Sequence, residues 1–184
     1  PDHPQLQTWL EEGLSIEPHT HDHPCPCLQG SAFQKAKATY DECIDLLSLI
    51  PNTELAAFRM PCCDSMNSMS PRFFAEIFNR TTPAGNFTRM DSSVFMLFTP
   101  ADAELPRDLV IEEDGQHRFD KYVPRNRRFV NYVENYPYPY VIGRLCWEIP
   151  SAIPDDWQGH NLQGPHNATT IRDMKAAIDA TVAK

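Results

Sequence analysis

The stretch FTRMDSSVFMLF, residues 87–98, predicts a β-strand that is interrupted by a polar break at Asp91-Ser92-Ser93. Short apolar runs bounded by polar or turn residues are typical of strands buried in a sheet. Two more apolar runs, residues 55–58 and residues 140–149, predict strands on either side of it in the sequence. A short strand is also expected at residues 14–17. These four stretches are expected to supply the sheet of the fold.

Helical patterns lie between and around the predicted strands. Residues 5–12 read as the last turns of a helix that Gly13 ends. A longer helix is expected to begin at the capping residue Ser31 and to end at Pro51, because apolar residues recur at helical spacing between them. A short helix is expected to start at Pro71. The alternation of strands and helices favours an α/β architecture with parallel strands.

The last helix shows both a start signal and an apolar stripe. Thr170 is the expected N-cap, and Asp173 would complete a capping box with it. The predicted apolar stripe of this helix consists of Ile171, Met174, Ile178 and Val182.

The composition limits the class of protein. The 184 residues suffice for one domain with a hydrophobic core. Hydrophobic residues make up 41% and charged residues 22%, as in ordinary globular domains. A formal net charge of −9 argues against a nucleic-acid partner, which would select a basic face. No apolar run approaches the ~20 residues that cross a membrane, so no membrane span is expected.

Both ends of the chain lie within sequence that reads as helical. We therefore expect the chain to be a piece of a longer protein, truncated at both ends. Its compartment and its oligomeric state are not predicted from the sequence.

Three histidines crowd one short loop in IEPHTHDHPCPC, residues 16–27. His19 and His23 are four residues apart, a spacing that can bring two imidazoles to one side of a turn. Imidazole nitrogen is a good ligand for Zn²⁺, and a catalytic zinc site has about three protein ligands and a water molecule. The loop would then hold part of a metal site. The alternative is a solvated surface loop without a ligand.

Cysteines near the histidines permit another kind of site. Cys25, Cys27, Cys62 and Cys63 could form a closed structural thiolate site for Zn²⁺ or a disulfide between two loops. They lack the C-x₂-C spacing of common zinc knuckles. Reduced thiols are the third possibility.

Several motifs together resemble those of a known family. The string HTHDHP, residues 19–24, resembles the H-[ST]-x-x-H-P motif of the NodB-type polysaccharide deacetylases, which remove acetyl groups from amino sugars. FRMPCCD, residues 58–64, resembles the strand of that family that ends in R-x-P. The DSS at residues 91–93 and WEIPSAIPDDW, residues 147–157, resemble weaker family strings.

The resemblance implies a role for individual residues. His19 and His23 would be metal ligands, and Arg59 would orient the aspartate that acts as catalytic base. Pro61 and Trp157 would line the substrate pocket, and Asp156 would stand beside the catalytic acid.

The resemblance also implies a fold and a reaction. The fold would be a distorted (β/α)₇-type barrel of parallel strands, here incomplete, with residues 1–184 as one domain. The reaction would be hydrolysis of the acetamide of an N-acetylated sugar or a related amide, assisted by a divalent metal, expected to be Zn²⁺.

The chain also departs from the family pattern. It contains no T-F-D-D motif, which supplies the catalytic base and the third metal ligand, and no late apolar strand with the acid histidine. Pro150 stands where the family often has an aspartate. The alternatives are therefore a non-catalytic carbohydrate- or metal-binding relative, or a small-molecule amidase of the same superfamily.

Overall fold

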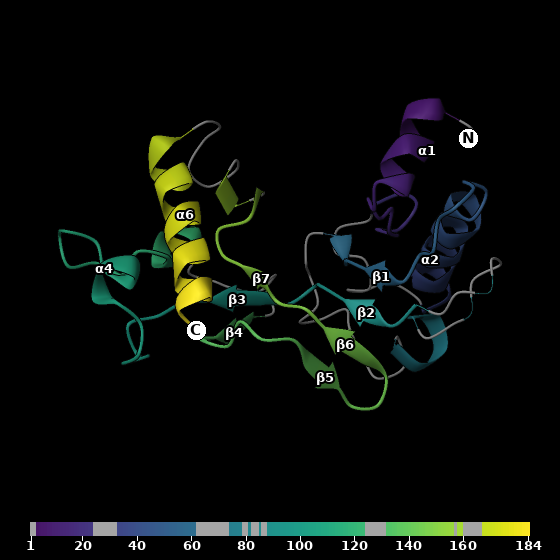
Figure 1. The fold of residues 1–184 in the computed structure, drawn as a ribbon. Coiled ribbons are helices and arrows are strands. Elements are labelled where there is room, and N and C mark those ends of the chain that lie inside the picture. The colour runs from purple at the N-terminus through teal and green to yellow at the C-terminus, as the bar shows by residue number, and fades with distance from the viewer. Residues whose placement is uncertain are drawn as a thin grey trace. The chain divides into compact units, whose positions relative to one another are not determined.

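The described strands form two separate sheets, each in its own compact unit (Figure 1). The computed structural model describes residues 3–23, 33–61, 74–78, 81, 85, 88–123, 132–156, 158–159 and 167–184. The first unit comprises Pro1–Ser93 and Pro139–Ile149, and the second comprises Val94–Tyr138 and Pro150–Lys184.

The sheet of the first unit has four strands in the order β1-β2-β6-β5. β1 (Ala57–Phe58), β2 (Met90–Asp91) and β6 (Cys146–Glu148) are parallel, and β5 (Tyr140–Ile142) is antiparallel to β6. The register places Phe58 beside Asp91, and Asp91 beside Glu148. The carboxyl ends of three strands therefore lie at one edge of this sheet.

Helices bury the apolar core of the first unit. This unit also contains α1 (Pro4–Glu11), α2 (Phe33–Leu47) and the one-turn π-helix η2 (Phe74–Phe78). On α2 the apolar spacing seen in the sequence buries Ala36, Tyr40 and Ile44. The ring of Tyr40 packs edge-on against Phe58 of β1, with ring centres 5.1 Å apart. Burying one such side chain contributes about 1.5–3 kcal/mol, so this contact holds α2 against the sheet.

Residues 140–149 form a hairpin and not the single strand that was predicted. The N–H of Leu145 donates to the carbonyl of Ile142 at 3.0 Å, which closes a tight turn between β5 and β6. Gly143, the first central residue of the turn, has φ +58°. Glycine adopts this conformation without a steric cost, which suits it to the three-residue loop between the paired residues Ile142 and Cys146. A continuous apolar run therefore folded back on itself at its only glycine.

Residues 14–17, also predicted as a strand, form none. The segment nevertheless runs beside β1. A carboxylate oxygen of Glu17 accepts the N–H of Ala57 at 2.8 Å, and the N–H of Arg59 donates to the carbonyl of Pro18 at 3.4 Å. The side chain of Glu17 thus supplies a hydrogen-bond acceptor at the edge of β1, where a neighbouring strand would otherwise pair.

The second unit contains a three-stranded sheet in the order β4-β3-β7, with every pair parallel. β3 (Phe95–Leu97) is its buried centre, between β4 (Tyr132–Glu134) and β7 (Ser151–Ala152). The unit also contains α4 (Arg107–Val110), the 3₁₀ turn η3 (Asp120–Tyr122) and α6 (Ala168–Ala183). The polar break predicted after Asp91 falls where the chain passes from the first unit to the second.

The prediction of an α/β fold with mostly parallel strands is confirmed. The described strands form two open sheets, and they close no barrel. The (β/α)₇-type barrel and the single domain over residues 1–184 therefore stay predictions.

The start of α6 differs from the prediction. Asn167, not Thr170, is the N-cap, and its side-chain oxygen accepts the N–H groups of Thr169 and Thr170 at 2.8 and 3.4 Å. The predicted starts of two other helices, Ser31 and Pro71, lie outside the described residues.

The apolar stripe of α6 lies on its exposed face. Ile178 is 62% exposed and Val182 is 81% exposed, whereas Ala177 and Ala180 are buried. The buried face also carries Asp173, which is fully enclosed. An ion network therefore determined which face of α6 packs inward, against the hydrophobic pattern of the sequence.

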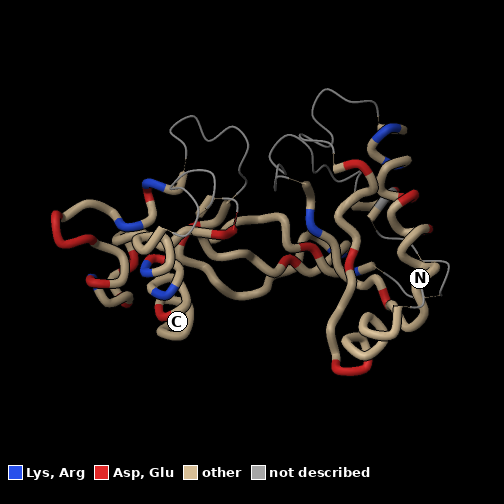
Figure 2. The backbone as a smooth tube through the Cα atoms, turned by 90° about the horizontal axis from the view of Figure 1, so that it is seen from above, with Lys and Arg blue, Asp and Glu red and all other residues tan. Residues whose placement is uncertain are grey.

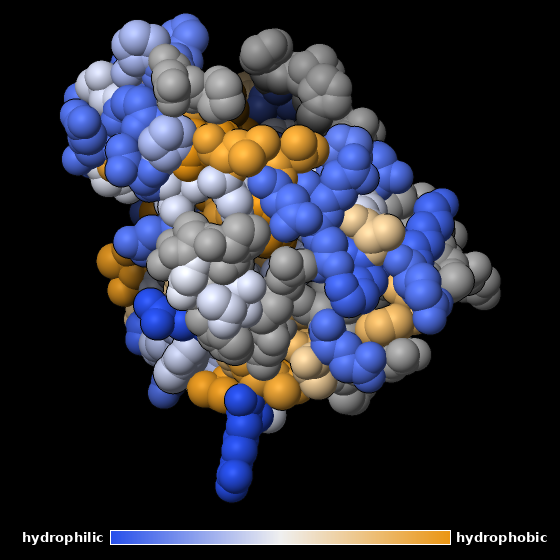
Figure 3. Space-filling model, turned by 90° about the vertical axis from the view of Figure 1, so that its right-hand side faces the viewer, coloured by the Kyte–Doolittle hydropathy of each residue, from blue (hydrophilic) through white to orange (hydrophobic). Residues whose placement is uncertain are grey.

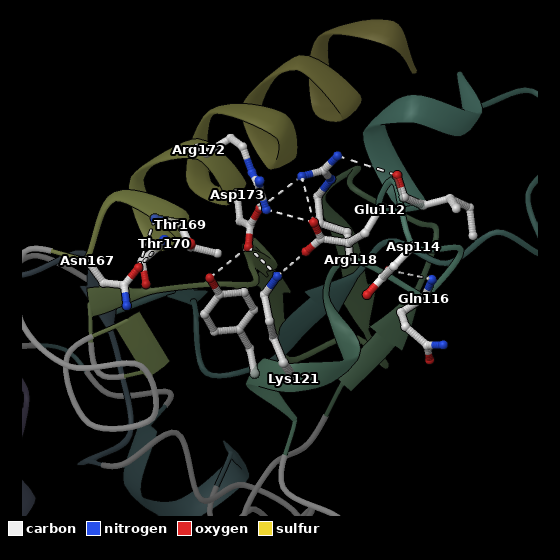
Figure 4. A network of polar contacts seen from close by, with 12 residues as sticks. Glu112, Asp114, Gln116, Arg118, Lys121, Asn167, Thr169, Thr170, Arg172 and Asp173 are labelled. Carbon is white, nitrogen blue, oxygen red and sulfur yellow. Dashed lines mark hydrogen bonds and ion pairs between the residues drawn. The ribbon is translucent and has the colours of Figure 1, made fainter.

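Asp173 is the centre of a polar network in the second unit (Figure 4). Its carboxylate accepts from Arg118 at 3.0 Å and from the hydroxyl of Tyr122 at 2.9 Å, and it pairs with Lys121 at 2.7 Å. Burial by itself raises the pKa of Asp173, but hydrogen bonds from Lys121, Arg118 and Tyr122 outweigh burial and hold this pKa below its ordinary value. Asp173 is thus ionised and paired.

The surface of the described chain is mixed in character. Figure 2 shows basic residues interspersed with acidic ones in both units, and Figure 3 shows apolar residues between hydrophilic ones on the face it draws. Several large apolar side chains of the first unit are exposed, including Trp9, Leu14 and Leu49. Among the described residues, no helix has both the length and the apolar character that a membrane crossing needs.

The Asp173 network predicts a loss of stability in acid. Because the folded state holds the pKa of Asp173 below that of the unfolded chain, its contribution is present above about pH 4 and disappears as the pH falls through the folded-state value. Asp173→Asn should lower the free energy of unfolding by on the order of 2 kcal/mol at pH 6 and should weaken the decline of stability below about pH 4. Urea unfolding of both proteins measures this difference. Asp179→Asn, on the exposed face of the same helix, is the matched control and should behave as the wild type.

The exposed and buried faces of α6 are the reverse of those predicted from the sequence, so substitutions on the two faces should have different effects on stability. Ile178→Ala should change the free energy of unfolding by less than about 0.5 kcal/mol, because the side chain is mostly in water. Ala180→Leu should cost about 1–3 kcal/mol, because the site is filled. Urea unfolding measures both changes. A larger loss for Ile178→Ala than for Ala180→Leu would support the buried face that was predicted from the sequence.

Candidate functional site

The two predicted metal ligands lie at either end of a strained turn in the first unit. His19 is half-buried, and His23 is exposed. Thr20 has φ +66° and His23 has φ +48°. A β-branched residue such as threonine seldom adopts this left-handed conformation, which costs of order 1–3 kcal/mol. The turn thereby brings the rings of His19 and His23 to a centre-to-centre distance of 4.9 Å.

Contacts with α2 hold the turn in place. The hydroxyl of Thr39 donates to the carboxylate of Asp22, and the N–H of His21 donates to the carbonyl of Thr39 at 3.0 Å. The hydrogen bond from Thr39 lowers the pKa of Asp22. The ring of His21 points to Glu42 of α2, with 3.4 Å between Nδ1 and Oε2, and not to the other two histidines.

A thiol of α2 lies beneath the same turn. Cys43 is a buried free cysteine. Burial raises the pKa of this thiol, and the backbone N–H groups of His19 and Thr20 oppose the rise only in part. Cys43 is therefore a neutral packing residue.

The ring of His19 is oriented by the backbone of Arg59. Its Nδ1 lies 2.7 Å from the carbonyl oxygen of Arg59, directly after β1. Because a carbonyl can only accept, Nδ1 carries the proton in this contact. Metal-binding histidines are commonly oriented by such a bond, which leaves Nε2 as the nitrogen for the metal.

The two rings fit half of a zinc site. Two imidazoles on one tetrahedral Zn²⁺ have ring centres about 5 Å apart, since each nitrogen lies ~2 Å from the metal. The observed 4.9 Å and the 58° between the ring planes agree with that arrangement. Beside the rings, the buried hydroxyl of Thr20 has no hydrogen-bond partner among the described residues. Within the same described part of the chain, no group of three or more His, Cys, Asp or Glu residues could hold a metal.

The guanidinium of Arg59 contacts a serine. Nη2 donates to the hydroxyl of Ser92 at 2.9 Å, and that hydroxyl donates to the carbonyl of Ile149 at 2.8 Å. Arg59, Ser92 and Ile149 directly follow β1, β2 and β6, so one hydrogen-bonded chain crosses the carboxyl ends of the three parallel strands. Among the described residues, this chain of contacts includes no aspartate partner for Arg59.

The last residues of β2 and β6 are two enclosed acidic residues. Asp91 and Glu148 are fully buried and are neighbours in the register of β2 and β6. Burial raises the pKa of Asp91, and hydrogen bonds with Glu148 and Ser93 oppose the rise without cancelling it. Burial likewise raises the pKa of the neighbouring Tyr140 and Cys146, each to about 12, and the two acidic groups add to the effect.

This acidic pair was not predicted from the sequence. Asp91 was noted only as part of the DSS string, and Glu148 was assigned no role. An acidic residue inside each of two apolar stretches was the available signal, because carboxylates are seldom fully buried without a function or a partner.

The remaining predicted residues are not brought to the histidines by any described contact. Pro61 is buried directly after Met60 in the first unit. Asp156 is exposed and belongs to the second unit. Trp157 and the four loop cysteines Cys25, Cys27, Cys62 and Cys63 lie outside the described residues.

Three comparisons with known proteins identified no similar protein. The chain matches no family model, no curated protein and no solved structure. The similarity to the NodB-type deacetylases thus rests on the short motifs alone and stays a prediction.

Proposed function

We propose that this chain carries the metal-binding half of a hydrolase that removes acetyl groups from N-acetylated sugars or related amides. The observation that supports this most is the pairing of the His19 and His23 rings at 4.9 Å, with His19 oriented by the carbonyl of Arg59. A solvated loop without a ligand would need neither the strained turn nor the bond to Arg59.

Each described residue would have a distinct role. The rings of His19 and His23 would bind the metal. Arg59, whose Nη2 donates to Ser92, would orient the aspartate base from its position directly after β1. A bound divalent metal such as Zn²⁺ would supply polarisation of the amide carbonyl and an acidified water. Pro61 and Trp157 would line the substrate site, and Asp156 would lie near the acid. A third metal ligand, a base and an acid would come from outside these motifs.

The fold supports this proposal at the level of architecture. In parallel α/β folds, functional residues gather at the carboxyl ends of the strands, and His19, Arg59 and Ser92 lie at that edge of the first sheet. We propose that the parallel strands belong to a (β/α)₇-type barrel that further elements would complete. A binding relative without catalysis would use the same two histidines and differ only in turnover.

The histidine pair predicts a weak metal site. Co²⁺, added in place of Zn²⁺, should give an absorption spectrum with nitrogen ligands, and Zn²⁺ should compete for the site. His19→Ala and His23→Ala should each weaken metal binding by at least ~10-fold, because each removes one of two protein ligands. His21→Ala is the matched control, since that ring faces Glu42. Equal losses in all three variants would contradict the assignment.

The resemblance assigns the catalytic base to a motif that this chain does not contain, and it therefore predicts no turnover by this chain alone. Acetate release from an N-acetylated chito-oligomer should stay at the rate of the buffer with Zn²⁺ present. Hydrolysis that depends on His19 would show that the chain supplies its own base, and the proposed roles would have to be reassigned.

A further inference from the structure

We propose that the exposed apolar stripe of α6 is a self-association surface, on which a second copy of this chain pairs through its own α6 across a two-fold axis. The stripe consists of Ile171, Met174, Ile178 and Val182. This inference goes beyond the proposed function and does not depend on it, because α6 belongs to the second unit and the histidine turn belongs to the first.

The stripe runs along the outer side of α6. Its side chains follow one another at intervals of three or four positions, which places them in one row on a helix. Their exposure ranges from 36% for Met174 to 81% for Val182. Figure 4 shows the opposite side of the helix, where Asp173 points toward Arg118 and Lys121. Because these ion pairs fix the rotation of α6 about its axis, they leave the apolar row exposed.

An exposed apolar row on a regular helix favours association. Helices ordinarily bury their apolar side, and contiguous apolar patches at the surface mark interaction sites. The row from Ile171 to Val182 is about 17 Å long, at a rise of ~1.5 Å per residue. A contact between two such rows buries less than the roughly 800 Å² per partner of a stable complex. The association should therefore be weak and should require a high concentration of the chain.

The charges on one flank of the stripe indicate which partner fits it. Lys175 and Asp179 are exposed and lie four positions apart along this flank. Within the described part of the chain, neither of them takes part in an ion pair. A surface that presents an unpaired cation and an unpaired anion next to each other is complementary to a copy of itself in the reverse orientation. The partner is therefore a second copy of this chain.

A two-fold axis at the level of Ala177 pairs both charges. A helix that meets its own copy about an axis perpendicular to it runs antiparallel, and the same flank of both helices comes together. Lys175 then lies opposite the partner's Asp179, and by symmetry Asp179 lies opposite the partner's Lys175. Two equivalent ion pairs thus form from one flank.

The same register interleaves the apolar side chains. The partner's Ile178 falls between the levels of Met174 and Ile178, and the partner's Val182 falls between those of Ile171 and Met174. The side chains of one helix therefore enter the gaps between those of the other, as in ordinary helix packing. One arrangement satisfies both the apolar row and the charges beside it.

A parallel pair of helices is less favourable. It would bring the flank that carries Lys175 and Asp179 against the opposite flank of the second copy. That opposite flank carries Thr181 and no charged residue between positions 171 and 182. Both charges would then lose water without gaining a partner, which is costly.

The first measurement is sedimentation of the chain between about 10 µM and about 1 mM, a range that covers weak association. The wild type should be monomeric at the lower concentration and should approach the mass of a dimer at the higher one. Ile178→Asp should stay monomeric throughout, because it places a charge in the contact. Leu49→Asp, the same kind of change at an exposed apolar residue of the first unit, is the matched control and should associate as the wild type does. A wild type that is monomeric at both concentrations, or equal losses in the two variants, would overturn the proposal.

The second measurement tests the pairing of the charges. Lys175→Glu and Asp179→Lys each place like charges opposite each other, so each variant alone should associate several-fold more weakly than the wild type at low salt. An equimolar mixture of the two variants should recover association, because every contact then joins an anion of one variant to a cation of the other. A mixture that associates no better than the separate variants would contradict the register and with it the proposal.

Unfolding at about 10 µM separates self-association from packing within one chain. Ile178→Asp should leave the free energy of unfolding nearly unchanged at this concentration, since the side chain of Ile178 is mostly in water in the monomer. A large loss would show that the stripe packs against another part of the same chain, and the proposal would then be wrong. Because these measurements need no metal, a failure of zinc binding at His19 and His23 would count against the proposed function alone.

Discussion

The parallel register of β1, β2 and β6 is the constraint on which the candidate site depends. It places Phe58, Asp91 and Glu148 side by side, so the next residue of each strand emerges at one edge of the sheet. Arg59, Ser92 and Ile149 are those residues, and one chain of hydrogen bonds joins them. Segments separated by more than fifty positions thereby become neighbours, and the turn that carries His19 is attached to the same edge through the carbonyl of Arg59.

Two fully buried aspartates show how surroundings decide the state of one side chain. Asp173 receives hydrogen bonds from Arg118, Lys121 and Tyr122, and these lower its pKa in spite of burial. Asp91 faces another acid and no described cation, so burial raises its pKa. The contribution of Asp173 to stability is therefore lost as the pH falls, and that of Asp91 is lost as the pH rises. The two changes fall on opposite sides of about pH 4, so they do not cancel.

The turn from His19 to His23 has a strained backbone, and contacts with α2 stabilise it. Thr20 and His23 both have left-handed backbone conformations, and contacts of Asp22 and His21 with α2 hold the turn closed. Conformations of this cost persist where packing imposes them, and they are found most often at functional sites. A turn of this kind keeps two imidazoles close, and such pre-ordering would lower the entropy cost of filling the metal site that we propose.

The sequence by itself determined the class of fold, the main helices and the short motif around His19, because local patterns of apolar, proline and glycine residues govern individual elements. It did not determine which face of α6 packs inward: the apolar stripe favoured Ile178, whereas the ion pairs of Asp173 turned the opposite face to the core. Nor did it reveal the pairing of Asp91 with Glu148, since register between distant parallel strands is set by the packing of the whole sheet. The hydrophobic periodicity of a segment predicts which of its own residues face the core and which face water. Partners for buried charges are supplied by other segments, and only the tertiary structure brings them together.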